Sequence, residues 1–152
     1  MIKISDIIEI WCDGGCKKDG TGGWGVVLKY KEHTKELYGG EQNTTNNQME
    51  LTACIKALEA IKTKGVPIVI YSDSTYVVKG INEWVEGWIR NNWIKSSDRK
   101  PVLNASLWQR LLLLSDNQKQ LKFVWVKGHD GNIGNEKADD LATKGIEEIY
   151  EK

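Results

Sequence analysis

Five segments of this chain have the apolar pattern of β-strands. The first is a continuous apolar run that leads into a glycine-rich turn, which is typical of a buried strand. The last alternates between polar and apolar positions, as expected of a strand whose two faces differ. A hairpin around Glu32 and His33 joins the second strand to the third. The predicted strands cover residues 7–13, 25–30, 36–40, 66–71 and 121–126.

A long amphipathic helix is predicted between the third and fourth strands. Asn47 and Glu50 have the spacing of a capping box, so the helix should begin there. It runs to about Lys62, and Gly65 is the expected stop. The apolar positions that recur at helical intervals are Met49, Ala53, Ala57, Leu58 and Ile61.

Three further helices are predicted in the second half of the chain. Ser74 is placed to cap a short helix that continues through Val77. Another helix starts at Asn104 or Ser106, and the last covers residues 135–149. Three successive strands, followed by alternating helices and strands, favour an α/β fold. We therefore expect a five-stranded mixed sheet, three antiparallel strands and then parallel ones, flanked by helices in one domain over residues 1–152.

Four acidic residues carry the clearest chemical signal. Asp13 and Asp73 each end an apolar strand, Glu50 lies at a helix start, and Asp139 follows a Gly-His loop. If the strands that end in Asp13 and Asp73 are parallel neighbours, both side chains lie at the sheet edge where open α/β folds bind ligands. Hard divalent cations prefer carboxylate oxygens, and a pair of cations can cleave a phosphodiester. The sequence therefore predicts a metal-dependent nuclease.

Each acidic residue also has a simpler interpretation. Glu50 could be only a capping partner for Asn47, and Asp73 could only stabilise the positive end of a helix dipole. Seen alone, Asp139 is typical of a solvated surface residue, and helical periodicity does not distinguish it from its neighbour Asp140. The presence of all four in one chain favours the metal site.

Composition limits the kinds of binding surface and the cellular location that we expect. Lys and Arg number 21, as do Asp and Glu, so the formal net charge is zero and nucleic acid would be bound by a local patch. No apolar run approaches the roughly 20 residues of a membrane span, and the N-terminus lacks a signal-peptide pattern. We expect a cytoplasmic protein without membrane contact. The odd count of three cysteines favours reduced thiols, with Cys12 and Cys54 in the core.

A series of motifs resembles those of the bacterial-type ribonuclease H family, ribonuclease H type 1. The resemblance extends from about Ile8 to Ile146. Each motif alone is a weak signal, but together, in order and at the family's spacing, they are specific. The motifs are Asp13-Gly14, Thr45 to Leu51, Ser72 to Val77, Pro101-Val102, Leu107 to Arg110, Trp125 to His129 and Asn135 to Ala142.

The resemblance implies the ribonuclease H-like fold and a monomeric endonuclease that hydrolyses the RNA strand of an RNA–DNA hybrid. By position, Asp13, Glu50, Asp73 and Asp139 would bind two ions of Mg²⁺ or Mn²⁺. One ion would activate water and the other would stabilise the leaving 3′ oxygen, giving 5′-phosphate and 3′-hydroxyl ends. His129 would lie on a mobile loop and assist proton transfer or product release.

Substrate contacts follow from the same resemblance. Only RNA offers a 2′-hydroxyl, which both donates and accepts, and side-chain amides meet both roles. Asn46 and Asn47 are the expected readers of that hydroxyl, and Thr45 a DNA-phosphate contact. Trp84 would pack on the DNA sugar-phosphate from a protruding, tryptophan-rich segment over about residues 79–101, called the handle below.

Two segments depart from the family's pattern. The handle has five basic and three acidic residues, a net charge of +2, whereas family handles are often more basic; we therefore expect weaker hybrid binding. The loop over residues 16–23 does not have the frequent Asn-Pro-Gly-Pro, and Lys17 or Lys18 could bind a DNA phosphate there instead.

Apart from Trp84, we expect Trp88 to be a packing residue, and Trp93, Trp108 and Trp125 to be in the core.

Three other functions are compatible with parts of the sequence. An inactive nucleic-acid-binding module would gain nothing from four carboxylates near phosphates. A nuclease of the wider superfamily that acts on duplex DNA, such as a resolvase or transposase core, would not need Asn46, Asn47 and Trp84. A structural metal-binding domain would bind metal tightly without turnover, but hydrated Mg²⁺ is a poor structural staple. The hybrid-specific endonuclease is therefore the leading hypothesis.

Overall fold

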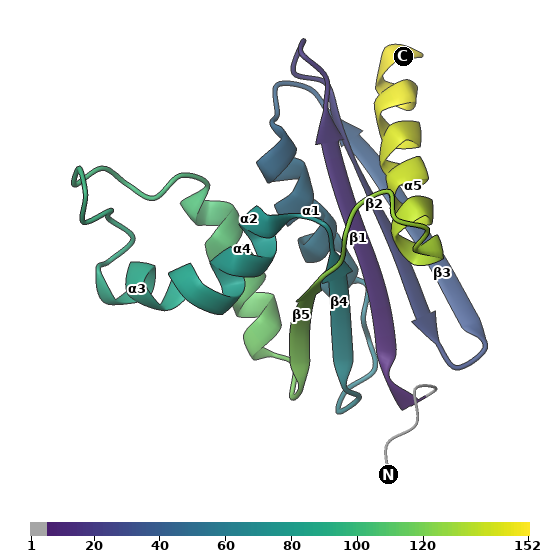
Figure 1. Cartoon of the computed structure of the whole chain (residues 1–152), viewed down its shortest axis with the longest axis horizontal. Coiled ribbons are helices and arrows are strands. Elements are labelled where there is room, and N and C mark those ends of the chain that lie inside the picture. The colour runs from purple at the N-terminus through teal and green to yellow at the C-terminus, as the bar shows by residue number, and fades with distance from the viewer. Residues whose placement is uncertain (1–5) are drawn as a thin grey trace.

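The structure is a computed structural model that describes residues 6–152, and its centre is a five-stranded mixed sheet (Figure 1). The strand order is β3-β2-β1-β4-β5; β1 pairs antiparallel with β2, and β2 with β3, while β4 is parallel to both β1 and β5. This confirms the predicted fold class. The strands are β1 (Ile8–Cys16), β2 (Gly22–Tyr30), β3 (His33–Glu41), β4 (Ile68–Ser72) and β5 (Leu121–Trp125).

Helices cover the two faces of the sheet because β1 is apolar on both of its faces. Ile10 and Cys12 on β1 face the main core, which they share with α1 (Asn46–Glu59) and α4 (Ala105–Asp116). Trp11, between them, faces a second cluster that contains Ala138 and Leu141 of α5 (Ile133–Tyr150). This alternation places α1 and α5 on opposite sides of β1, as Figure 1 shows. Cys12 and Cys54 are buried, as predicted.

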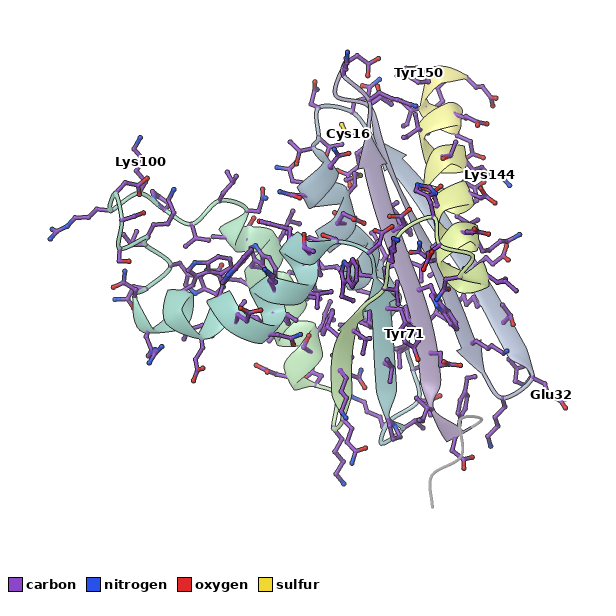
Figure 2. All side chains as sticks on the ribbon, in the orientation of Figure 1. Cys16, Glu32, Tyr71, Lys100, Lys144 and Tyr150 are labelled. Carbon is purple, nitrogen blue, oxygen red and sulfur yellow. The ribbon has the colours of Figure 1, made fainter. Side chains whose placement is uncertain are left out.

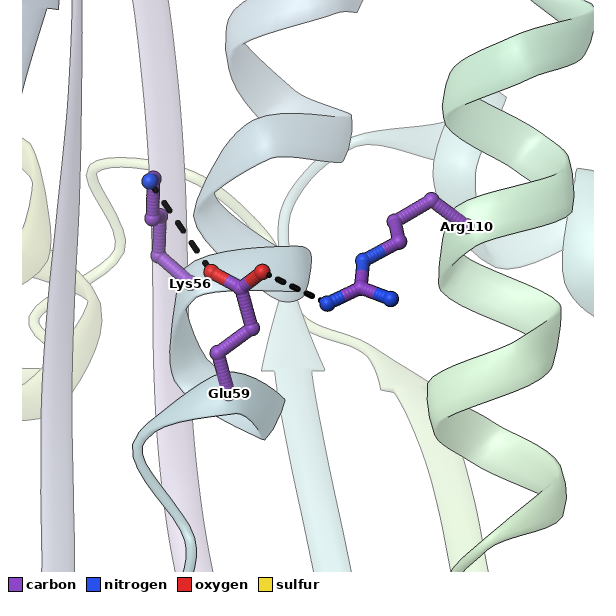
Figure 3. A network of polar contacts seen from close by, with 3 residues as sticks. All are labelled: Lys56, Glu59 and Arg110. Atoms are coloured by element: carbon purple, nitrogen blue, oxygen red, sulfur yellow. Dashed lines mark hydrogen bonds and ion pairs between the residues drawn. The ribbon is translucent and has the colours of Figure 1, made fainter.

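The ends of α1 differ from the prediction. Thr45, not Asn47, is the N-cap, and its hydroxyl accepts a hydrogen bond from the backbone N–H of Gln48 at 3.1 Å. Glu50 is therefore not a capping-box partner. The helix ends at Glu59, six residues before Gly65, and the carboxylate of Glu59 contacts Lys56 at 3.8 Å and Arg110 of α4 at 3.0 Å (Figure 3). This contact joins the C-terminal end of α1 to α4.

The handle extends away from the sheet and is built on an aromatic cluster. It follows α2 (Thr75–Lys79), continues through the π-helical turn η2 (Gly80–Trp84) and α3 (Val85–Arg90), and returns through an isolated bridge between Ile94 and Pro101. Lys100 lies at its far end (Figure 2). Ser74 caps α2 as predicted, since its hydroxyl accepts from the N–H of Val77. The rings of Trp84, Trp88, Trp93, Trp108 and Tyr76 form a chain of contacts with centroids 5.3–6.1 Å apart.

The tryptophan predictions are mostly right. Trp108 is fully buried, and Trp88 and Trp93 pack against the core. Trp125, predicted to be core, is 48% exposed. The reason is that Trp125 is the last residue of β5, which is an edge strand of the sheet. In the part of the chain that the structure describes, no helix is both long and apolar enough to cross a membrane.

Candidate active site

Two of the predicted carboxylates meet at one edge of the sheet because of strand register. The parallel pairing of β1 with β4 places Cys12 opposite Ser72. Asp13 and Asp73 are the next residues of the two strands. Asp73 follows the end of β4, whereas Asp13 remains in β1, which continues to Cys16 beside β2. Figure 1 shows that the N-terminal end of α1, which carries Glu50, reaches this edge as well.

Gly14 allows Glu50 to join them. A Cβ atom at Gly14 would lie 2.4 Å from the backbone carbon of Met49 and 2.5 Å from the nitrogen of Glu50, so only glycine permits this close packing of β1 on α1. The backbone N–H of Gly14 is also close enough to the Glu50 carboxylate to counter part of the rise in its pKa. The close approach thus places a carboxylate from α1 beside Asp13.

Asp13, Glu50 and Asp73 together form a compact acidic cluster. One carboxylate oxygen of each lies within 4.8 Å of the others. Asp13 is only 6% exposed and Glu50 only 9%. Asp139 of α5 lies near this group, close enough to Asp13 to contribute to the rise in the pKa of Asp13. Asp139 is half-buried, whereas its neighbour Asp140 is exposed.

Burial and neighbouring negative charges strongly raise the pKa values of two carboxyl groups in this cluster. Desolvation raises the pKa of Asp13 to about 10, and the neighbouring charge of Glu50 and the hydrogen bond with Asp139 contribute to the rise. Desolvation, followed by the charge of Asp73, also raises the pKa of Glu50 well above its ordinary value. These carboxylates cannot all be ionised at low cost unless a cation compensates them.

The residues present fit a divalent cation. Oxygen ligands from several carboxylates are what Mg²⁺ and Mn²⁺ require. In addition, Oε1 of Glu50 is buried and has no hydrogen-bond partner, which is costly for a carboxylate oxygen unless something else binds it. Asp13, Glu50 and Asp73 are thus able to hold a metal ion, with Asp139 beside them.

Asp73 is held by groups that the sequence did not single out. The indole N–H of Trp125 donates to its backbone carbonyl at 3.1 Å, and Nδ2 of Asn135 lies 3.4 Å from its Oδ2. Asn135 belongs to one of the family-like motifs, but the motif gave no sign of its partner. The loop after β5 also crosses Asp73 closely, because a Cβ at Gly128 would be 2.7 Å from that Oδ2.

His129 is the next residue of this loop. It is exposed, and its φ of 55° lies in the left-handed region, which is uncommon for residues other than glycine. Such conformations cluster at functional sites. The contact of Gly128 with Asp73 places the loop that carries the imidazole at the rim of the carboxylate cluster.

The predicted substrate-contact residues lie on exposed positions at the start of α1 and on the handle. Thr45, Asn46 and Asn47 are exposed in the first turn. Trp84 is 37% exposed and packs between Tyr76 and Trp88 in the aromatic cluster. A hollow of about 530 Å³ beside it is lined in part by basic residues, Arg90 and Lys95.

A hydrogen-bonded chain that sequence reasoning missed connects these two regions. Nε2 of Gln48 donates to Oδ1 of Asn104 at 3.1 Å, and Nδ2 of Asn104 donates to the hydroxyl of Tyr76 at 3.2 Å. The indole of Trp108 donates to the same hydroxyl at 2.9 Å. The start of α1 and the base of the handle are therefore held in fixed relation. These residues are far apart in sequence, so no local pattern could reveal the connection.

The loop that departs from the family's pattern is fixed against the start of α1. The backbone N–H of Thr44 donates to the carbonyl of Gly20 at 2.9 Å, and the hydroxyl of Tyr150 donates to Asp19 at 2.9 Å. Figure 2 shows Tyr150 and Cys16 at the same end of the molecule. Lys17 and Lys18 are exposed on this loop, next to the segment that contains Thr45.

Comparison with known proteins gives one consistent result. The family profile described as RNase H matches residues 5–147. A ribonuclease H from Methylobacillus flagellatus is 56% identical over 146 residues, which is 95% of this chain and 95% of that protein. The crystal structure of LC9-RNase H1, a type 1 RNase H with the type 2 active-site motif, is 28% identical and superposes with a TM-score of 0.82, covering 97% of this chain and 75% of that one.

A more distant structure has the same fold. The foamy viral protease-reverse transcriptase in complex with an RNA/DNA hybrid contains a region that superposes with a TM-score of 0.83 at 21% identity. The match covers 96% of this chain and 21% of that one.

Proposed function

Since this chain belongs to the RNase H family, we propose that it is an endonuclease that hydrolyses the RNA strand of RNA–DNA hybrids with divalent cations, leaving 5′-phosphate and 3′-hydroxyl ends. The observation that carries the proposal is the convergence of Asp13, Glu50 and Asp73 within 4.8 Å at one edge of the sheet. A solved protein of the same fold is in complex with a hybrid, but that likeness concerns the fold alone.

The four carboxylates are proposed to hold two ions of Mg²⁺ or Mn²⁺. Asp13, Glu50 and Asp73 supply a buried set of oxygens, and Asp139 extends it from α5. When bound, the cations would activate the attacking water and stabilise the departing 3′ oxygen. The protein's own contribution is to keep the carboxylates close together, largely desolvated and fixed before the substrate arrives, so that little reorganisation is needed during the reaction.

His129 is proposed to exchange a proton at the rim of the site. An imidazole both accepts and donates protons near neutral pH, which suits proton transfer to a leaving oxygen or release of the product. Its exposed position on the loop after Gly128 gives it access to solvent, to which a proton must finally pass. The role is auxiliary, because His129 lies outside the cluster of Asp13, Glu50 and Asp73 that would hold the cations.

Substrate selection is proposed to come from the start of α1 and from the handle. The amides of Asn46 and Asn47 would read the 2′-hydroxyl of the RNA strand, and Thr45 would contact a DNA phosphate. Trp84 would pack on a DNA sugar-phosphate, beside the hollow lined by Arg90 and Lys95. The hydrogen bonds that link Gln48, Asn104 and Tyr76 support a shared role for α1 and the handle in substrate binding. They hold these two contact regions at a fixed spacing.

The decisive experiment offers the protein a labelled RNA–DNA hybrid, duplex RNA and duplex DNA of the same sequence, with Mg²⁺, with Mn²⁺ and with a chelator. Metal-dependent cleavage of only the RNA strand of the hybrid is expected. Cleavage of duplex DNA would favour a different nuclease of the superfamily. Binding without cleavage by a folded protein would favour a nucleic-acid-binding module.

We further propose that residues 1–152 act as a single monomeric catalytic domain in the cytoplasm, with the handle over residues 79–101. A single mixed sheet and its flanking helices span the described residues from Ile8 to Tyr150, which supports one domain. Light scattering of the purified chain tests the oligomeric state, and a mass of twice 17.2 kDa would contradict it.

A further inference from the structure

Asn135 is a polar residue in an unusually buried place. It lies in the first turn of α5 and is 1% exposed. An amide without solvent contact destabilises the fold unless its hydrogen bonds are made within the protein. Its backbone N–H is satisfied by Oδ1 of Asn132, the N-cap, at 2.9 Å, but its own Oδ1 has no partner. Packing or capping alone therefore does not explain an asparagine here.

The side chain of Asn135 points at a carboxylate of the acidic cluster. Its Nδ2 lies 3.4 Å from Oδ2 of Asp73, across 62 residues of sequence. An ionised carboxylate can only accept, so the amide presents its N–H to Asp73. Hydrogen bonds to charged acceptors are about twice as strong as neutral ones, and they fix the direction of the group they contact.

Among the described residues, the other groups around Asp73 do not donate a hydrogen bond to its carboxylate, so Asn135 supplies this contact. The indole of Trp125 binds the backbone carbonyl of Asp73, not its side chain. Gly128 restricts the carboxylate sterically through its backbone. Within residues 6–152, Asn135 is the side chain whose hydrogen bond reaches the Asp73 carboxylate. The helix turn that carries the amide is packed in the interior, since Asn135 is 1% exposed and Ala138 is fully buried one turn later.

We propose that Asn135 is a positioning residue for the metal site: its amide orients the Asp73 carboxylate toward Asp13 and Glu50 and stabilises its negative charge. The inference rests on the proposed function, because it assigns these carboxylates to a cation. Asn135 itself does not touch the reacting atoms. Groups that orient metal ligands typically change metal affinity or activity by about 10- to 100-fold when they are replaced.

The test compares Asn135→Leu, which has a similar volume and no donor, with Asn132→Ala. The control removes the N-cap of the same helix turn but leaves the amide of Asn135 in place. Binding of Mn²⁺ to each protein without nucleic acid is measured by paramagnetic resonance of the free ion. Thermal unfolding without metal measures the structural cost of each change.

We expect Asn135→Leu to bind Mn²⁺ about tenfold more weakly, and Asn132→Ala to bind it like the unchanged protein even if it unfolds at a lower temperature. Higher Mn²⁺ should restore part of the cleavage rate of Asn135→Leu. If Asn135→Leu does not fold, Asn135→Ser, which is smaller and cannot span the distance to Asp73, takes its place with the same expectation.

Equal Mn²⁺ affinity in the Asn135 variant and the unchanged protein would overturn the inference, as would equal weakening in the Asn132 control. The failure of the proposed function looks different. In that case the unchanged protein binds Mn²⁺ but does not cleave the hybrid, while the effect of Asn135 on Mn²⁺ affinity remains measurable.

Discussion

The backbone of Gly128 lies against the side chain of Asp73, so closely that a Cβ atom at position 128 would be 2.7 Å from Oδ2 of the carboxylate. Two parts of the candidate active site, the end of β4 and the loop that carries His129, are therefore in direct contact. A change in either should be transmitted to the other.

Replacing Gly128 with alanine should disturb the site with little effect on the fold. The added methyl must displace either the Asp73 carboxylate or the loop, and misplacement of a reacting group by about 1 Å can cost roughly 100-fold in rate. We expect kcat for hybrid cleavage to fall by about tenfold or more at nearly unchanged thermal stability. Gly15→Ala is the matched control, because nothing lies within 4 Å of its added Cβ. Equal rates in the two variants would remove the contact from the mechanism.

Replacing Asp13 with asparagine should abolish cleavage and stabilise the metal-free protein. Asparagine has the shape of the carboxyl group but no charge, so it cannot serve as an anionic ligand, and it relieves the crowding of Asp13 with Glu50 and Asp139. Removing such a functional strain typically adds roughly 0.5–2 kcal/mol to the free energy of unfolding. Denaturant unfolding with a chelator, alongside the cleavage assay, measures both effects. Retained cleavage would contradict the assignment of Asp13 as a metal ligand.

The raised pKa of Asp13 predicts how stability depends on pH without metal. Its pKa is about 10 in the native protein, against an ordinary value of 3.8, so between these limits the native state binds more protons than the unfolded state. The stability contributed by this group is therefore fully present below about pH 4 and is lost as pH rises toward 10. Cations compete with that proton, so Mg²⁺ should stabilise the protein more at pH 9 than at pH 6.

Thermal unfolding at several pH values, with chelator and with Mg²⁺, measures this dependence. Other groups titrate over the same range, so Asp13→Asn is the necessary control, since it lacks the group in question. The metal-free melting temperature of the unchanged protein should fall more steeply with pH than that of the variant. Parallel curves for the two proteins would contradict the prediction.

His129→Ala should slow turnover without eliminating it. A positioned general acid or base typically contributes about 10²- to 10⁴-fold, but solvent can partly replace an exposed imidazole. We expect a loss of kcat near the lower end of that range, with unchanged affinity for the hybrid. Single-turnover kinetics would separate slower chemistry from slower product release. Complete inactivity would give His129 a more central role than its place at the rim implies.

Much of the site was predictable because it depends on local patterns. Asp13 and Asp73 each follow an apolar run. The carboxyl ends of neighbouring parallel strands lie on the same side of a sheet. What escaped prediction depends on tertiary packing. The contact of Asn135 with Asp73 and the chain from Gln48 to Tyr76 join residues far apart in sequence, and no periodicity encodes them.

Two predictions are wrong, and each has an identifiable structural cause. The strand pattern predicts Trp125 in the core, yet its position on an edge strand leaves it exposed. The spacing between Asn47 and Glu50 predicts Asn47 as the cap, whereas Thr45 supplies the cap two residues earlier. Here the carboxylate of Glu50 turns instead toward Gly14 and Asp13.

Replacing both Asn46 and Asn47 with alanine should weaken the recognition of RNA more than general binding to nucleic acid. Both residues are exposed in the first turn of α1, so the change leaves the core and the Thr45 cap intact. Removing two neutral hydrogen bonds corresponds to about 1–3 kcal/mol, or roughly 10- to 100-fold in kcat/KM for the hybrid. Affinity for duplex DNA, which lacks the 2′-hydroxyl, should change by less than about threefold. Fluorescence anisotropy with both duplexes, at one fixed salt concentration, provides the comparison. Equal losses for the two duplexes would show that the amides contact the backbone rather than read the ribose.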